Sequence, residues 1–182
     1  MDILAHALWT TAAGIAGRKR LKQHIHLGWL AAWGVFPDLV VFTIPACVKI
    51  WRVLTGASKT LLPDGRGPHF EWVWGLYNFT HSAIVFCFCF GAFWLLVQKP
   101  VLEMLGWAIH IIVDVFTHGG MFAIKFLWPV SSVHVDGKRW ETAWFLAANY
   151  TALASLYVWL YLRRFATQND TAHRAFERRP RP

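Results

Sequence analysis

The sequence predicts an all-α membrane protein, a helix bundle with about five membrane segments and one further helix lying in the membrane interface. The first observation is composition, because 56% of the 182 residues are hydrophobic and the chain holds twelve Trp and fourteen Phe, unlike an ordinary water-soluble domain. The second is the absence of strand-like alternation, which favours helices over a closed barrel. The third is that basic clusters flank the apolar runs, as the positive-inside rule expects.

The first two membrane segments are predicted over residues 3–17 and 27–44. The first is short for a full crossing at about 1.5 Å per residue, so a tilted or partly interfacial position suits it. The second is broken by Pro37 and stopped near Pro45, because proline lacks the N–H of the helical hydrogen bond.

The interfacial helix and a loop are predicted next. Residues 46–58 mix Lys49 and Arg52 with bulky apolar side chains, which is typical of a helix lying in the plane of the interface. Residues 60–68 contain two prolines and two glycines, a composition that predicts a loop.

Three further membrane segments are predicted in the second half of the chain. They cover residues 72–97, 101–118 and 143–162. Gly119 and Gly120 end the fourth segment, since glycine readily adopts the backbone angles found beyond a helix C-cap. The polar, basic sequence after the fifth segment predicts disorder. The chain therefore divides into a membrane-embedded bundle over residues 1–164 and a cytoplasmic tail over residues 165–182.

The net charge of +8 comes largely from basic clusters beside the apolar segments. That placement predicts the lipid bilayer as the partner and argues against nucleic acid. If residues 18–22 and 163–164 are both cytoplasmic, five segments cross alternately and the N-terminus lies outside. Ionisable residues of four segments then reach a similar depth on the outer side. They are His6, Asp38, His81, His110, Asp114 and His118.

The most informative stretch is HIIVDVFTH, residues 110–118. At 3.6 residues per turn, His110, Asp114 and His118 share one face of a helix. Ionisable groups at the centre of a membrane helix cost about 2.5–3.5 kcal/mol each, so they face one another or a wet cavity. Imidazole nitrogen and carboxylate oxygen suit zinc and similar divalent ions. The stretch therefore predicts a metal site or a proton relay.

Each of the other candidate ligands also has a structural interpretation. His6 could be a packing residue that bonds a carbonyl group, and Asp38 could cap the turn after Pro37. His81 could lie in a polar helix start with Thr80 as its cap. Taken together with the HxxxDxxxH stretch, the metal site or proton relay remains the better interpretation.

Short motifs follow one another along the chain. They are Met1-Asp2, His6-Ala7-Leu8, Pro37-Asp38, Thr80-His81-Ser82, His110 to Asp114, and Trp128-Pro129. In this order and spacing the chain resembles the YdjM-type family of bacterial inner-membrane proteins, described as metal-dependent hydrolases, over nearly its whole length up to the basic tail. Leu76-Tyr77 departs from the His-Arg pair of many members, so any role of that pair is absent or moved to His69, His134 or Arg139.

The resemblance implies a multi-pass protein of the bacterial cytoplasmic membrane. The family is in turn distantly similar to helical zinc phospholipase C and S1-type nucleases, whose clustered metals lie among His and Asp ligands. Carried over by motif order, the expected ligands are His6, Asp38, His81, His110, Asp114 and His118. The expected cofactor is Zn²⁺ or a similar ion, with two ions bridged by Asp114.

The expected activity is metal-dependent hydrolysis of a phosphoester, including a lipid-linked one, at the outer membrane–water boundary, with Asp38 and Asp114 as catalytic carboxylates. His134 and Arg139 are predicted to bind an anionic substrate. Asp2 and Thr10, one turn on either side of His6, are predicted to orient its imidazole. Two alternatives stay open, namely a proton or metal-ion transporter and a non-catalytic membrane protein with a closed, structural metal site.

Overall fold

The structure is a computed structural model that describes residues 1–18, 24–59 and 71–177. Over these ranges it contains six α-helices, two short 3-10 helices and no strand. The predicted all-α class is therefore confirmed. The loop predicted at 60–68 lies outside the described residues.

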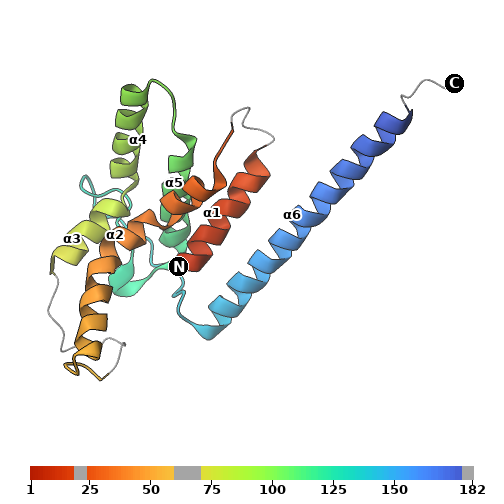
Figure 1. The fold of residues 1–182 in the computed structure, drawn as a ribbon. Coiled ribbons are helices and arrows are strands. Elements are labelled where there is room, and N and C mark those ends of the chain that lie inside the picture. The colour runs from red at the N-terminus through yellow and green to blue at the C-terminus, as the bar shows by residue number, and fades with distance from the viewer. Residues whose placement is uncertain (19–23, 60–70, 178–182) are drawn as a thin grey trace.

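The helices follow the chain in a simple order (Figure 1). They are α1 (Ile3–Gly17), α2 (Leu27–Leu54), α3 (Glu71–Thr80), α4 (Ala83–Val97), η1 (Leu102–Met104), α5 (Leu105–Thr117), η2 (Gly120–Phe122) and α6 (Ala143–Glu177). The bounds of α1 match the prediction from sequence, and α6 begins where the fifth segment was predicted to begin.

The number of membrane spans is smaller than predicted. Within the described residues, α2 and α6 are long and apolar enough to cross a membrane, and α3 with α4 makes a third candidate if the bent pair is one span. This agrees with a membrane protein, but about five spans is not supported. The reason is length, because α1 has 15 residues and α5 has 13. Helices of that size reach roughly 20 Å, against a hydrocarbon core of about 30 Å.

No separate interfacial helix follows the second segment in the described part of the chain. Helix α2 continues through Pro37 and Pro45 to Leu54, so the predicted break and stop are both wrong. Proline removes one backbone hydrogen bond and commonly bends a helix, and packing around it can keep the helix continuous. Figure 1 shows this outcome, since α2 changes direction midway along its length.

The segment predicted as one helix over 72–97 is two helices. The chain breaks at His81 and Ser82, and the axes of α3 and α4 differ by 62°. Ser82 caps α4 by accepting a hydrogen bond from the backbone N–H of Val85, at 3.2 Å. The cap is therefore Ser82 rather than Thr80.

Helix α6 extends beyond the predicted end of the fifth segment. It continues to Glu177, so the backbone of residues 165–177 is helical where the sequence predicted disorder. Neither glycine nor proline occurs between residues 165 and 177 to stop the helix. Residues 178–182 lie outside the described part.

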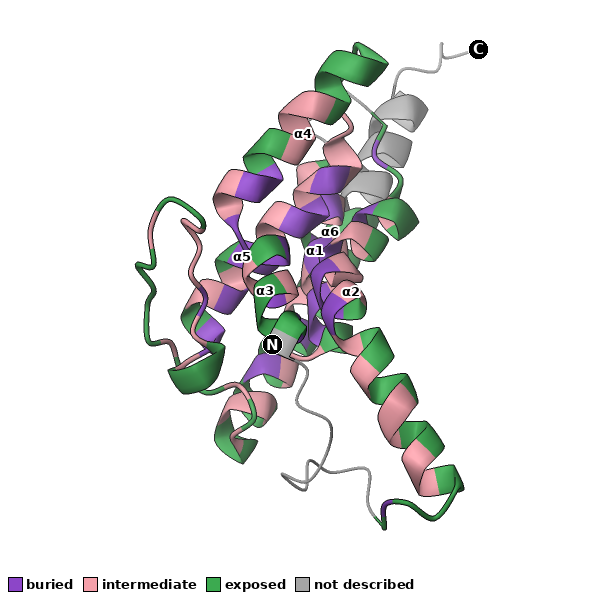
Figure 2. Cartoon of the chain, turned by 90° about the vertical axis from the view of Figure 1, so that its left-hand side faces the viewer, coloured by how far each residue is buried: buried purple, intermediate pink, exposed green. Residues whose placement is uncertain are grey.

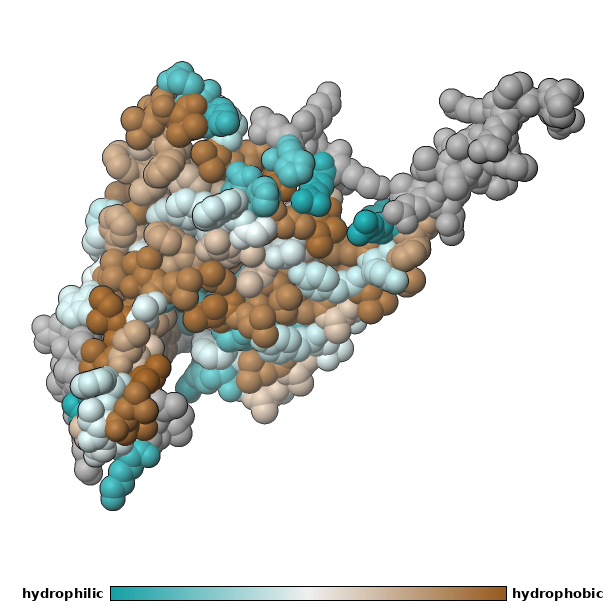
Figure 3. All heavy atoms as spheres, viewed as in Figure 1, coloured by the Kyte–Doolittle hydropathy of each residue, from teal (hydrophilic) through white to brown (hydrophobic). Residues whose placement is uncertain are grey.

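The core lies where α1, α2 and α5 pack together, and buried residues concentrate there (Figure 2). Small residues allow this close approach. A Cβ atom at Gly34 of α2 would meet the side chain of Thr10, and one at Gly106 of α5 would run into the backbone of Leu30. Figure 3 shows that apolar residues cover much of the outer surface on the side it presents. The polar residues described next are therefore enclosed by tightly packed helices.

Candidate metal centre

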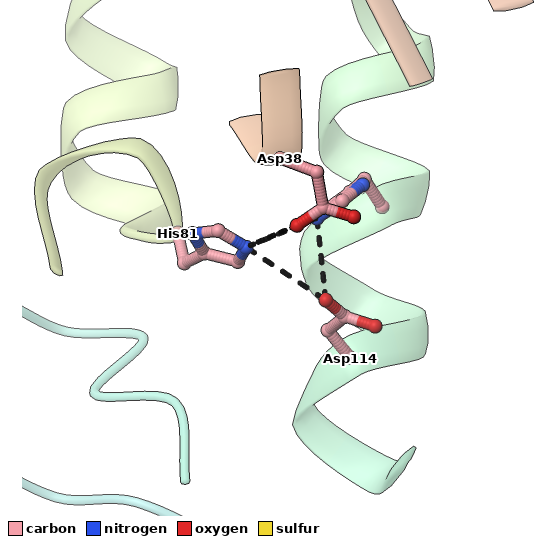
Figure 4. A group of neighbouring side chains, drawn as sticks. Asp38, His81 and Asp114 are labelled. Atoms are coloured by element: carbon pink, nitrogen blue, oxygen red, sulfur yellow. Dashed lines mark hydrogen bonds and ion pairs between the residues drawn. The ribbon is translucent and has the colours of Figure 1, made fainter. Parts of the chain in front are cut away.

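Four buried side chains meet where α2, α5 and the α3–α4 bend come together (Figure 4). They are Asp38, His81, His110 and Asp114. One ligand atom from each lies within 4.8 Å of the others. The exposed fraction is 1% or less for His81, His110 and Asp114, and 6% for Asp38. The grouping unites residues far apart in sequence at the centre of the bundle.

The two histidines face each other across this group. His110 Nε2 lies 3.1 Å from His81 Nε2 and 3.2 Å from Asp114 Oδ2. His81 Nε2 lies 3.7 Å from Asp114 Oδ2 and 3.6 Å from Asp38 Oδ1. Asp38 Oδ1 is also 3.8 Å from His110 Nε2. Two imidazole nitrogens and two carboxylate oxygens thus converge on one small volume.

The other ring nitrogen of each histidine is bound to backbone, which fixes the proton position. His110 Nδ1 lies 2.7 Å from the carbonyl oxygen of Gly34, and His81 Nδ1 lies 3.0 Å from that of Tyr77. A carbonyl oxygen can only accept, so each Nδ1 carries the hydrogen and donates it. In the neutral rings both Nε2 atoms then present lone pairs to each other and to two carboxylates. This arrangement is repulsive unless a positive charge lies between them.

A divalent metal ion fits these donors. Two nitrogens bound to one tetrahedral zinc ion lie about 3.3 Å apart, close to the 3.1 Å between the two Nε2 atoms. Backbone carbonyls that accept from the far ring nitrogen are the usual partners of metal-binding histidines. Asp114 Oδ2 is buried without a hydrogen-bond partner. A buried oxygen without a partner is expected where it serves as a metal ligand.

The second oxygen of Asp114 faces a different set of groups. Asp114 Oδ1 lies 2.9 Å from His6 Nε2, 3.2 Å from His118 Nδ1 and 2.5 Å from the Met1 nitrogen. Thr117 donates its hydroxyl to the same oxygen at 3.2 Å. The structure thus gathers the other five candidate ligands around Asp114: three in the compact group, and His6 and His118 at its second oxygen.

His6 belongs to this buried assembly through its ring. Its ring stacks on that of His110, with centroids 3.8 Å apart. His6 is 1% exposed, and its Nε2 has no hydrogen-bond partner despite its closeness to Asp114. His6 is therefore packed within the buried assembly, and its Nε2 makes no hydrogen bond to a carbonyl group.

Asp2 and Thr10 hold the backbone of α1 rather than the His6 imidazole, contrary to the prediction. Asp2 Oδ1 accepts from the N–H of Ala5 at 3.0 Å and from the hydroxyl of Tyr150 at 2.8 Å. Thr10 donates to the carbonyl oxygen of His6 at 2.7 Å. A side chain one turn away on a helix reaches the backbone more easily than the neighbouring ring.

The loop residues predicted to bind substrate are exposed and do not belong to the four-residue group. His134 is exposed, with Nδ1 3.2 Å from the carbonyl oxygen of Ser132. Arg139 forms an ion pair with Glu141 on the surface. The hydrogen bond from its own backbone N–H, together with Arg139, keeps the pKa of Glu141 below its usual value. His69 lies outside the described residues.

Two residues that hold the histidines were missed from the sequence. Gly34 supplies the carbonyl for His110 and allows α1 to approach α2 closely. Tyr77 supplies the carbonyl for His81, and its ring stacks on the imidazole with centroids 4.1 Å apart. Tyr77 stands four residues before His81, a spacing that could have indicated the contact within one helical turn.

No protein-family model, no curated protein and no solved structure matches this chain.

Proposed function

We propose that the chain is a membrane-embedded, metal-dependent hydrolase that cleaves a phosphoester, including a lipid-linked one. One observation carries the proposal. Two histidine nitrogens with free lone pairs lie 3.1 Å apart beside two carboxylates. Burying such an electron-rich group in an apolar bundle is very unfavourable without a cation.

The chain offers ligands for a first ion and a place for a second. The first would take Nε2 of His81 and His110 with Oδ1 of Asp38 and Oδ2 of Asp114. The second would take Asp114 Oδ1 with His6 and His118, as the family resemblance implies. Zinc is the ion that best suits this donor set.

When bound, the ion would polarise the phosphoester and bring the pKa of a water molecule toward neutrality. The protein residues then have separate tasks. Asp38 is the most exposed of the four ligands. We therefore assign to it the role of the base that accepts a proton from the attacking water. Asp114 contacts histidines through both oxygens and fixes their relative positions.

The position of the centre favours an amphiphilic substrate. Asp38 lies near the middle of α2, one of the two long apolar helices, and large apolar side chains are exposed on α2, α3 and α4. A phosphoester attached to a lipid reaches such a depth more readily than a soluble one. The cytoplasmic membrane of a bacterium is the location that the resemblance implies.

The second candidate is a structural metal site, and a specific observation favours it. Four protein ligands surround one position and three of them are 1% exposed or less, which is typical of a closed site. A proton path is less well supported. In the described part of the chain, every buried His, Asp, Glu, Lys or Arg side chain belongs to this one cluster.

The test is metal content together with hydrolysis. The detergent-purified chain, prepared without chelators, is measured by elemental mass spectrometry and then assayed for phosphate release from chromogenic phosphoesters and from phospholipid micelles. Bound metal with hydrolysis that is lost in Asp38→Asn supports the hydrolase. Bound metal without hydrolysis of any of these substrates supports the structural site. The absence of metal after incubation with Zn²⁺ would contradict both.

A further inference from the structure

The bend between α3 and α4 carries His81, so the contacts that hold the bend also hold a ligand. A break in an apolar helix leaves backbone groups without helical partners, and in lipid each unsatisfied group costs several kcal/mol. The structure satisfies these groups through residues distant in sequence. The inference that follows rests on the metal centre proposed above.

Ser82 lies at the bend and makes two side-chain hydrogen bonds. It is completely buried. Its hydroxyl donates to the carbonyl oxygen of Trp128 at 2.5 Å and accepts from the N–H of Val85 at 3.2 Å. The next residue, Ala83, donates its backbone N–H to the carbonyl oxygen of Phe126 at 2.9 Å. The loop at 126–128 is therefore fastened to the start of α4.

Trp107 holds the other side of the bend. Its indole N–H donates to the carbonyl oxygen of Thr80 at 2.5 Å, and the side chain is 3% exposed. Trp107 lies on α5, one turn before His110. Helix α5 thus provides His110 to the centre and also bonds the backbone next to His81.

The His81 ring has little freedom once the bend is fixed. Its backbone N–H and its Nδ1 both bond the carbonyl oxygen of Tyr77, each at 3.0 Å. A change in the angle between α3 and α4 would therefore move Nε2 away from His110 rather than rotate the ring alone. Metal sites tolerate little displacement of their ligands.

We propose that Ser82 and Trp107 are positioning residues that set the His81 imidazole opposite His110 for metal binding. Neither side chain supplies a ligand atom to the four-residue group. Their action on the metal passes through the backbone of residues 80–82. Removing either hydrogen bond weakens the metal site by about 10–100-fold, the range found when partners behind a metal ligand are changed.

The experiment titrates the full detergent-purified chain with Co²⁺, whose visible absorption reports the arrangement of its ligands. Ser82→Ala removes both side-chain bonds of the cap. Trp107→Phe removes the indole donor and keeps the aromatic packing. The matched controls are Ser131→Ala, which removes a serine that accepts the N–H of Val133 in the exposed loop, and Trp9→Phe, which removes an indole that donates to Asn149 between α1 and α6.

The expected result is weaker Co²⁺ binding and an altered spectrum of the bound ion in Ser82→Ala and Trp107→Phe, with both controls like wild type. Wild-type spectra at saturation in both variants would overturn the positioning role, even if their affinity fell, because general destabilisation does not rearrange the ligands. Circular dichroism checks helix content, and Trp107→Phe decides the question if Ser82→Ala loses helix. Failure of the wild-type chain to bind Co²⁺ would instead overturn the metal centre itself.

Discussion

Helices α5 and α6 differ in nearly every respect that matters for function. Helix α5 has 13 residues and buries six of them, including Trp107, His110 and Asp114. Helix α6 has 35 residues, yet among its described side chains only Asn149 and Leu153 are buried. The longer helix is suited to lipid, while the shorter one is enclosed by protein and carries ionisable groups. In this molecule length and exposed apolar side chains distinguish the helix suited to lipid, and buried ionisable groups within an apolar helix mark the candidate site.

The two helices are also held in different ways. Helix α5 approaches α2 so closely that Gly106 lies against the backbone of Leu30. Helix α6 is joined to α1 through side-chain hydrogen bonds, such as that from Tyr157 to the carbonyl oxygen of Leu8 at 2.9 Å. A change at the metal centre should therefore affect α5 far more than α6.

Removal of the metal should produce the largest difference between them. Treating the metal-loaded chain with a chelator should lower the free energy of unfolding by about 4 kcal/mol, relative to metal at a thousand times its Kd. Amide hydrogen exchange should rise in α5 and remain nearly unchanged in residues 143–165 of α6. Thermal unfolding and exchange detected by mass spectrometry measure the two effects. Equal increases in both helices would show that the metal does not stabilise α5 in preference to α6.

Asp114→Asn should come next, because it removes the carboxylate shared by both sides of the centre. We expect the free energy of metal binding to weaken by about 3 kcal/mol, which raises Kd more than a hundredfold. Elemental analysis and a Zn²⁺ competition titration measure it. Asp136→Asn is the matched control, because that carboxylate accepts from the N–H of Gly120 in the loop and should leave metal content intact. Full metal occupancy in Asp114→Asn would exclude Asp114 as a ligand.

Gly106→Ala should separate α5 from α2. The added Cβ would meet the backbone of Leu30, which cannot move aside as a flexible side chain can. Overpacking of this kind costs about 1–3 kcal/mol, and it should also weaken metal binding by moving His110. Gly91→Ala is the control, since nothing lies within 4 Å of its added Cβ. Denaturant unfolding compares the two, and equal stabilities would show that close α2–α5 contact is not required.

Tyr150→Phe should have the smallest effect and weaken only the contact between α6 and the start of α1. It removes the hydroxyl that donates to Asp2 Oδ1 at 2.8 Å, at a cost of about 1 kcal/mol. Metal content should not change, because the contact lies on the α6 side of α1. Tyr161→Phe, at an exposed ring that packs on Phe165, is the control. A loss of metal in Tyr150→Phe would show that α6 supports the centre after all.

The sequence was most informative where local rules decide the structure. The bounds of α1 and the start of α6 follow from runs of apolar residues, and the shared face of His110 and Asp114 follows from helical periodicity. These features need no knowledge of the neighbouring helices.

The features that the sequence did not predict correctly depend on contacts between residues distant in sequence. The bend at His81 and Ser82 is held by Trp107 and by the carbonyl group of Trp128, 46 residues after Ser82. No local sequence pattern predicts such partners. Likewise Pro45 does not end α2, since a proline inside a helix can kink it without ending it. His134 and Arg139 were linked to the centre by charge alone, and the fold places them on the surface.

The four-residue spacing of His110, Asp114 and His118 restricts the insertions and deletions that this protein can tolerate. Inserting or deleting one residue between two of them would turn everything beyond that point by about 100° around the helix axis. His118 would then leave the carboxylate that it now contacts at 3.2 Å. Substitutions along α5 can be tested by selection one at a time, whereas a single inserted codon there would dismantle the centre. The exposed residues 132–135, within the loop between η2 and α6, carry no such restriction, so length variation should collect there and be rare within α5.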